Sequence, residues 1–162
     1  MIKVGIIGAN GFLGLELLRI LSIHPKVEIY KILKRENDIE DEFTHLSLLN
    51  LNELQTSNID DFKSLDCVFL SLPHGSASEY AKELIDKVKI IDLSSDYRIH
   101  DATSYEAYYK TSFDPDIQSK FTYGFIESSL DNIKKSSNIA NPGCFALASQ
   151  LAIVPFHSLI KN

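Results

Sequence analysis

The sequence predicts an α/β protein with a doubly wound, mostly parallel sheet, and three observations near its start favour that fold. Residues 3–7 form a short β-branched run, which is typical of a buried parallel strand. Glycines then recur at intervals of three, and apolar residues follow at helical spacing up to residue 24. Pro25 ends this helix, and residues 27–33 have the pattern of a second strand. Together these segments make a β-α-β unit, the repeating element of a doubly wound sheet.

The glycine-rich turn between the first strand and the helix predicts a dinucleotide site. Gly8 permits a tight turn, and Gly11 lets the backbone approach a pyrophosphate that the N–H groups of the helix hold. Gly14 and Gly5 allow the helix and the strand to pack closely. The spacing G-x-x-G-x-x-G differs from the usual G-x-G-x-x-G, so the strand and helix around it carry the prediction, and a purely structural turn is the alternative. We expect the cofactor to contact Gly8, Asn10, Gly11, Phe12, Leu13 and Gly14.

The end of the second strand indicates which dinucleotide is bound. Sites for NAD place an acidic residue there for the ribose hydroxyl groups, whereas an arginine accommodates the 2′-phosphate of NADP. This chain has Lys34-Arg35 at that point, so we predict NADP as the cofactor and Arg35 as a ligand of its 2′-phosphate. The alternative is a solvated basic pair in a surface loop, and Glu36, which follows directly, weakens the preference for NADP.

Composition excludes several classes of protein. The chain has 162 residues, of which 44% are apolar, enough for one domain with a core. Its formal net charge of −6 argues against a nucleic-acid partner. No apolar run is long enough to cross a membrane, and the N-terminus lacks the pattern of a signal peptide. Cys67 and Cys144 are therefore expected to be free thiols in a cytoplasmic protein, and Cys67 a buried, unreactive one.

The remaining segments continue the alternation of strands and helices. Two segments have irregular patterns. Residues 36–58 are expected to form a loop with a short strand near 53–55, and residues 99–120 an ordered segment that passes over the strand ends. Strands are predicted at 66–72, 88–93 and 138–140, with an extended piece at 121–125. Helices are predicted at 59–65, 76–87 and 129–135.

Polar or glycine-containing loops follow four of the strands, at 8–11, 73–75, 94–98 and 141–144. In an open parallel sheet the carboxyl ends of the strands share one edge, and ligands bind there. The phosphate-binding turn and Cys144 are therefore expected to lie on the same edge of the sheet.

Cys144 stands directly after an Asn-Pro-Gly turn and before an apolar run at 145–154 that we predict to be a buried helix. The unpaired N–H groups and the positive end of the helix dipole favour a negative charge at this point. A thiol there loses its proton more readily, and the thiolate is a nucleophile. The alternative is that Cys144 is a small buried apolar residue at a helix start.

Five motifs together resemble the N-acetyl-γ-glutamyl-phosphate reductase family, an NADP-dependent family of arginine biosynthesis. They are GANGFLG at 8–14, SLPHG at 71–75, DLSSDYR at 92–98, YGFIE at 123–127 and ANPGC at 140–144. Their order and approximate spacing match the family, and the resemblance extends from residue 1 to about residue 155.

The resemblance implies a mechanism and a set of site residues. Cys144 would attack an acyl phosphate, a small-molecule substrate, expel phosphate and form a thioester that NADPH reduces to N-acetylglutamate semialdehyde. Asn141 and the N–H groups at the helix start would stabilise the oxyanion. Arg98 would bind the phosphate or carboxylate of the substrate, although a surface ion pair with Asp96 is the alternative.

The same resemblance places further residues beside the nicotinamide. Pro73 would pack near it, Ser94 would contact the cofactor, and His74 would shape the wall of the site rather than donate a proton.

Family members are about twice as long as this chain, and their second half holds most of a substrate domain and the general acid/base histidine. We therefore expect an NADP-binding domain at 1–145 and only the start of the substrate domain at 146–162. His157 lies beyond a kink expected at Pro155 and does not replace the missing base. We expect the chain to be a truncated form. The alternatives are a split-gene product and a degenerate copy. It would form a homo-oligomer or need a C-terminal half.

Three alternatives remain open at this point. The first two are aspartate-semialdehyde dehydrogenase and a reductase of carrier-protein-bound aminoadipyl or glutamyl phosphate. The third is a non-catalytic NADP-binding module.

Overall fold

A computed structural model describes residues 1–33, 54–56 and 58–159. Its centre is a six-stranded sheet in which every paired strand is parallel, in the order β2-β1-β3-β4-β6-β5. The predicted doubly wound sheet is confirmed. The strands are β1 (Ile2–Ile7), β2 (Val27–Leu33), β3 (Cys67–Leu70), β4 (Lys89–Asp92), β5 (Phe121–Tyr123) and β6 (Asn138–Ala140).

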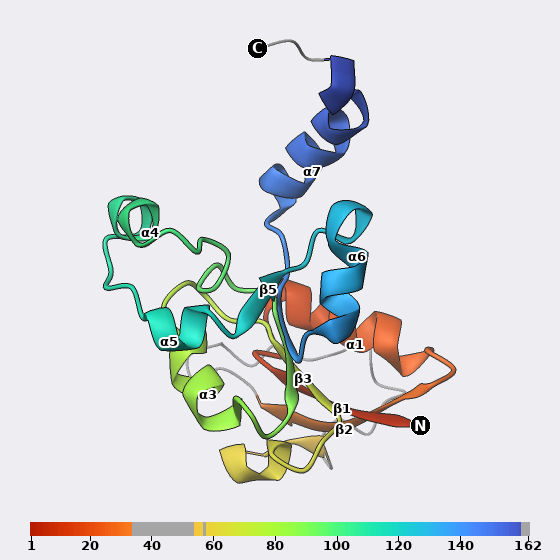
Figure 1. Ribbon diagram of the computed structural model, residues 1–162. Coiled ribbons are helices and arrows are strands. Elements are labelled where there is room, and N and C mark those ends of the chain that lie inside the picture. Colours follow the sequence, from red (N-terminus) through yellow and green to blue (C-terminus); the bar gives the residue numbers. More distant parts are fainter. Residues whose placement is uncertain (34–53, 57, 160–162) are drawn as a thin grey trace.

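Helices cover both faces of the sheet (Figure 1). The helix α1 (Phe12–Ser22) packs on one face through Leu18 and Leu21, and α3 (Ala77–Leu84) packs on the other through its buried alanines. The other helical elements are η2 (Ile59–Phe62), α4 (Ala102–Tyr109), α5 (Pro115–Gln118), α6 (Ile126–Lys135), α7 (Cys144–Ile153) and η3 (Val154–Leu159).

The strand β1, which lies between β2 and β3, contributes to both cores by alternation. Val4 and Ile6 belong to the cluster under α1, whereas Ile7 belongs to the cluster under α3. Gly5 faces the second side, where an added Cβ atom would lie 2.5 Å from the ring of Phe62 in η2. The expectation that Gly5 makes room for α1 is therefore wrong, because it makes room for Phe62.

The irregular segment at 99–120 contains two helices, α4 and α5, that apolar periodicity did not predict. Only Tyr105 is buried in α4, so its sequence carries no apolar stripe. The start signals are nevertheless present, since Asp101 caps α4 and Asp114 caps α5 by accepting hydrogen bonds from backbone N–H groups. Pro115 then occupies the first turn of α5, where its missing N–H costs nothing.

The prediction of a buried helix after Cys144 is correct for the helix and wrong for its burial. Every residue of α7 is exposed or half-buried, and 89% of Phe145 is accessible to solvent. Figure 1 shows why, since α7 leads away from the sheet towards the C-terminus. It ends at Ile153 and continues as η3, which contains Pro155. Among the described residues, no helix is both long and apolar enough to cross a membrane.

Candidate functional site

The loops that follow the strands lie side by side along one edge of the sheet. The strand order reverses between β1 and β3, and this reversal opens a crevice at the carboxyl ends of the strands. Backbone hydrogen bonds continue past the strand ends, from Ser71 N to the Ile7 carbonyl at 2.8 Å and from Asn141 N to the Asp92 carbonyl at 2.8 Å. The predicted common edge is therefore present.

The glycine turn has the geometry that a bound phosphate needs. Gly8 has φ of +84°, and a Cβ atom on it would lie 2.1 Å from the Ser71 carbonyl oxygen. A Cβ atom on Gly14 would lie 2.3 Å from the Gly8 carbonyl oxygen, so α1 approaches the strand end closely. Gly11 is the N-cap residue of α1 and, because it has no side chain, cannot cap this helix itself. The first N–H groups of α1 are thus available to a pyrophosphate, and the turn fits a dinucleotide.

Other residues predicted to bind the cofactor lie at different depths. Asn10 is buried, whereas 82% of Phe12 and 48% of Leu13 are accessible. Arg35, the predicted ligand of the 2′-phosphate, lies outside the described residues.

A cavity of about 980 Å³ joins the loops at this edge. Leu13 from α1, Ser94 after β4 and Cys144 at the start of α7 all line it, and so does Asn141. Residues predicted from three distant parts of the chain thus meet in one cavity. Pro73 is exposed and is not among the lining residues, although its neighbours Leu72 and His74 are.

The two free thiols differ in their surroundings. Cys144 is exposed at the first position of α7, and Gly143 before it offers no side-chain cap, so the thiol stands beside the N–H groups of the helix start. Cys67 is half-buried in β3, and burial raises the pKa of its thiol to about 11. The description of Cys67 as unreactive agrees with this environment, although the side chain is less deeply buried than predicted.

Arg98 ties two of the loops together beside Cys144. Its Nε donates to the Asn141 carbonyl at 2.8 Å, and Nη2 donates to the Leu93 carbonyl at 2.8 Å. Its Nη1 would lie 2.8 Å from a Cβ atom on Gly143. Both acceptors are neutral carbonyls, and within the described residues Arg98 forms no ion pair, so the guanidinium brings a positive charge against the turn that precedes Cys144.

Asp96, the alternative partner suggested for Arg98, has other partners. Its buried carboxylate accepts hydrogen bonds from Gly75 N at 2.7 Å and Ala77 N at 3.1 Å. It also lies 2.8 Å from Nδ1 of His74.

The contact between His74 and Asp96 was not predicted, although a histidine after one strand and an aspartate after the next are a signal for it. Nδ1 of His74 also lies 3.0 Å from the Ser95 hydroxyl, and its ring stacks on Tyr109 with centroids 4.1 Å apart. These contacts fix the imidazole in the wall of the large cavity.

Asn141 and Ser94 are held by their own loops. The amide nitrogen of Asn141 donates to the Pro142 carbonyl at 3.2 Å. The Ser94 hydroxyl donates to the Asp92 carboxyl group at 2.9 Å, and this hydrogen bond holds the Ser94 side chain in the lining of the cavity.

The buried carboxyl group of Asp92 predicts a pH dependence of stability. Burial raises its pKa from 3.8 to about 7, even though Ser94 donates two hydrogen bonds to it. Folding therefore favours the protonated form of Asp92. The stability that Asp92 contributes in this form is fully present below about pH 4 and is lost as the pH rises through about 7. We expect the free energy of unfolding to fall by up to about 1.4 kcal/mol per pH unit in this range, relative to Asp92→Asn. Urea denaturation of both proteins measures the difference, and parallel pH profiles would contradict it.

Comparison with known proteins identifies relatives of this chain. Residues 3–136 match the family model described as semialdehyde dehydrogenase, NAD binding domain. The N-acetyl-gamma-glutamyl-phosphate reductase of Herminiimonas arsenicoxydans is 40% identical over 96% of this chain and 46% of its own length. A Pyrococcus horikoshii protein named as a LysW-L-2-aminoadipate/LysW-L-glutamate phosphate reductase is 40% identical over 100% of this chain and 48% of its own length. The chain thus spans about half the length of the curated relatives it matches.

Solved structures agree on the fold. The aspartate semialdehyde dehydrogenase of Francisella tularensis superimposes with a TM-score of 0.66 and 17% identity over 98% of this chain and 41% of that chain. The enzyme of the same name from Candida albicans, solved with NADP, superimposes with a TM-score of 0.58 and 16% identity over 89% of this chain and 43% of that chain. The family match and the glycine turn together indicate a nicotinamide dinucleotide as the cofactor.

Proposed function

Because the chain belongs to the semialdehyde dehydrogenase family through its NAD-binding domain, we propose that it is the cofactor-binding and nucleophile-bearing part of an NADPH-dependent N-acetylglutamyl-phosphate reductase. The observation that carries the proposal is the position of Cys144. Its thiol is exposed at the start of α7, in the lining of the same cavity as Leu13 at the glycine turn. The name of the Herminiimonas arsenicoxydans relative supports the choice of substrate.

The proposed reaction proceeds through a thioester on Cys144. The thiolate attacks the acyl carbon of N-acetylglutamyl phosphate, a C–S bond forms, the bond from carbon to the phosphate oxygen breaks, and phosphate leaves. Covalent capture divides one difficult step into two easier ones. NADPH, when bound, supplies the hydride that reduces the thioester. Cleavage of the C–S bond then releases N-acetylglutamate semialdehyde and returns the thiolate of Cys144.

The surrounding groups have roles in this proposal that follow from their positions. The guanidinium of Arg98 attracts the phosphate or carboxylate of the substrate, because its charge is not neutralised by its two carbonyl acceptors. The N–H groups at the start of α7 stabilise the oxyanion that forms at the acyl carbon, and Asn141 assists them. Ser94 contributes to the wall beside the nicotinamide, and Pro73 lies on the adjacent loop.

The preference for NADP over NAD rests on Arg35 and gives a direct prediction. Replacing Arg35 with alanine should raise the dissociation constant for NADP about 10- to 100-fold, because a charge-assisted hydrogen bond to the 2′-phosphate is lost. The constant for NAD, which lacks that phosphate, should change less than about twofold. Isothermal titration calorimetry with both nucleotides measures the effect, and Lys34→Ala is the matched control. Equal weakening of NADP and NAD would remove the argument for the 2′-phosphate.

The working enzyme also needs polypeptide beyond the described elements. Apolar side chains of α7 and η3 are exposed, among them Phe145, Leu151 and Phe156, and this exposed apolar surface supports packing against further protein. The relatives are about twice as long, which supports a partner segment that corresponds to their remaining half, or a second copy of the chain. That segment would supply a general acid/base, which is typically worth about 10²–10⁴-fold in rate.

The reductase proposal is tested in the reverse direction. The chain is mixed with NADP, phosphate and N-acetylglutamate semialdehyde, and the absorbance of NADPH is followed. We expect NADPH with this aldehyde and none with aspartate semialdehyde. Normal NADP binding without NADPH from either aldehyde, also after addition of the polypeptide that corresponds to the remaining half of the relatives, would contradict a reductase and favour a nucleotide-binding module.

A second candidate substrate is supported by the Pyrococcus horikoshii relative, whose identity of 40% equals that of the acetylglutamyl enzyme. In this alternative the acyl group is aminoadipyl or glutamyl phosphate bound to a carrier protein. The same assay with the carrier-bound semialdehyde separates the two, since the preferred aldehyde gives the faster formation of NADPH.

A further inference from the structure

Gly143 lies between Pro142 and Cys144, and its own backbone does not explain why this residue is a glycine. Its φ of −70° and ψ of 151° are extended values that any residue adopts. It is also the N-cap of α7, a position where serine, asparagine or aspartate would cap the helix at least as well. The reason for the missing side chain therefore lies in what surrounds residue 143.

The guanidinium of Arg98 occupies the space that a side chain at residue 143 would need. A Cβ atom on Gly143 would lie 2.8 Å from Nη1 and 3.5 Å from Cζ of Arg98. In the described part of the chain, no other heavy atom outside residues 142–144 comes within 4 Å of that position. Gly8 and Gly14 differ, because there an added Cβ atom would first meet backbone atoms. Gly143 thus makes room for a charged side chain.

Arg98 is held in this place by two of its five N–H groups. Nε donates to the Asn141 carbonyl and Nη2 to the Leu93 carbonyl, each at 2.8 Å. The two N–H groups of Nη1 and the second of Nη2 donate to no other described residue. A guanidinium in a fixed orientation, with three N–H groups left for a ligand, therefore lies against the residue before Cys144.

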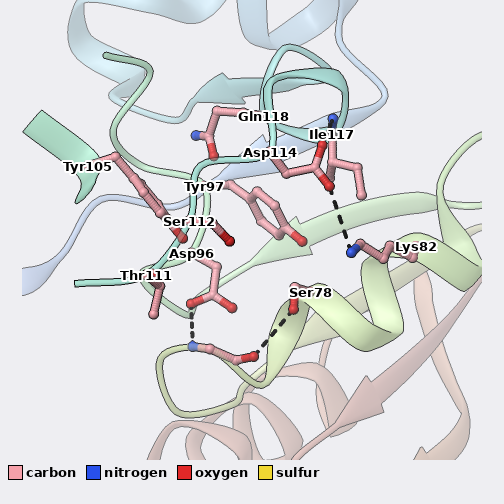
Figure 2. A pocket seen from close by; sticks show the side chains of 11 residues that line it. Ser78, Lys82, Asp96, Tyr97, Tyr105, Thr111, Ser112, Asp114, Ile117 and Gln118 are labelled. Carbon is pink, nitrogen blue, oxygen red and sulfur yellow. Dashed lines mark hydrogen bonds and ion pairs between the residues drawn. The ribbon is translucent and has the colours of Figure 1, made fainter. Parts of the chain in front are cut away.

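No carboxylate of the described residues shares the large cavity with Arg98. Asp96, two residues before Arg98, lines a different cavity of about 260 Å³, beside Ser78 and Lys82 of α3 (Figure 2). There its carboxylate accepts a hydrogen bond from Gly75 N at 2.7 Å. The positive charge of Arg98 is therefore available to an anion that enters the large cavity.

We propose that Gly143 is a positioning residue that acts through Arg98. Its lack of a side chain lets the guanidinium lie against the turn and keeps the positive charge next to Cys144. A methyl group at residue 143 displaces the flexible end of Arg98 and leaves the backbone in place, because the guanidinium is the group it meets. The inference rests on the proposed function for the identity of the anion, the phosphate or carboxylate of the substrate, and on the contacts alone for the position of the charge.

The test compares two alkylating reagents of similar size on Cys144, anionic iodoacetate and neutral iodoacetamide. Mass spectrometry of the peptide that contains Cys144 gives both rates, and the ratio of the iodoacetate rate to the iodoacetamide rate cancels changes in exposure and ionisation of the thiol. We expect this ratio to fall about three- to fivefold in Gly143→Ala, the effect of one unit charge at about 4 Å in water. Arg98→Ala should lower it at least as much. Neither rate requires turnover, so the result does not depend on whether the protein is a reductase.

Gly75→Ala is the matched control, because a Cβ atom there would meet no atom within 4 Å in the described part of the chain, and the ratio should stay unchanged. Gly143→Ala added to Arg98→Ala should cause no further fall, since the charge through which it acts is then absent. The thermal unfolding curve of Gly143→Ala should match that of the unsubstituted protein. An unchanged ratio in Gly143→Ala, an equal fall with and without Arg98, or loss of the fold in Gly143→Ala would each overturn the proposal.

Discussion

Replacing Cys144 with serine should reduce the formation of NADPH from N-acetylglutamate semialdehyde at least about 10³-fold, because a serine hydroxyl is not ionised at neutral pH and is a far weaker nucleophile. The dissociation constant for NADP should change less than about twofold. Cys144 is exposed and packs into no core, so the substitution leaves the glycine turn and the sheet intact. Absorbance at the NADPH band measures the activity, and isothermal titration calorimetry measures the dissociation constant for NADP.

Cys67→Ser is the matched control for this prediction. The Cys67 thiol lies in β3 and is not part of the lining of the large cavity. This substitution should therefore leave activity nearly unchanged. An acyl phosphate should also add its acyl group to the peptide that contains Cys144 and not to the one that contains Cys67, as mass spectrometry would detect. A Cys144→Ser protein that loses its affinity for NADP as well would assign Cys144 a structural role.

Replacing Gly8 with alanine should lower the free energy of unfolding by about 2–5 kcal/mol. The backbone there has φ of +84°, which costs an alanine about 1–2 kcal/mol. The new methyl group would also lie 2.1 Å from the Ser71 carbonyl oxygen, and overpacking against backbone typically adds about 1–3 kcal/mol. Urea denaturation measures the loss, and NADP affinity should fall with it if Gly8 forms the turn that holds the pyrophosphate, as we propose.

Gly75 is a matched control for the backbone conformation alone. It has φ of +85°, yet a Cβ atom on it would meet no atom within 4 Å. Gly75→Ala should therefore cost only about 1–2 kcal/mol, the strain without the contact. Equal losses in the two variants would show that the close approach of Ser71 to Gly8 does not contribute.

Much of the fold follows from local patterns. The predicted bounds of β2 and β6 coincide with those in the structure. The edge strand β2 alternates exposed and more covered residues after Pro25, and the short β6 ends at the Asn-Pro-Gly turn. The common edge was also predictable, since parallel strands direct all their carboxyl ends to one side. For that reason Leu13, Ser94, Asn141 and Cys144 could be placed in one site before any coordinates were known.

The rest depends on contacts that a linear pattern does not contain. Arg98 bonds to the backbone carbonyls of Leu93 and Asn141, and a carbonyl acceptor has no signature in the side-chain sequence. The ring of Phe62 next to Gly5 reflects how η2 docks on the sheet. The exposure of α7 was missed for a different reason, because apolar composition indicates a face that can be buried and does not say which protein segment covers it.

The most direct test of the shared cavity is the rate at which iodoacetamide alkylates Cys144 with and without saturating NADP. Both cysteines are followed by mass spectrometry in one sample, with Cys67 as the internal reference. If the thiol and the dinucleotide face each other across the cavity that Leu13 and Cys144 line, NADP should slow alkylation of Cys144 about tenfold or more and leave Cys67 unchanged. Alkylation of Cys144 at the same rate in the NADP-bound protein would contradict that arrangement.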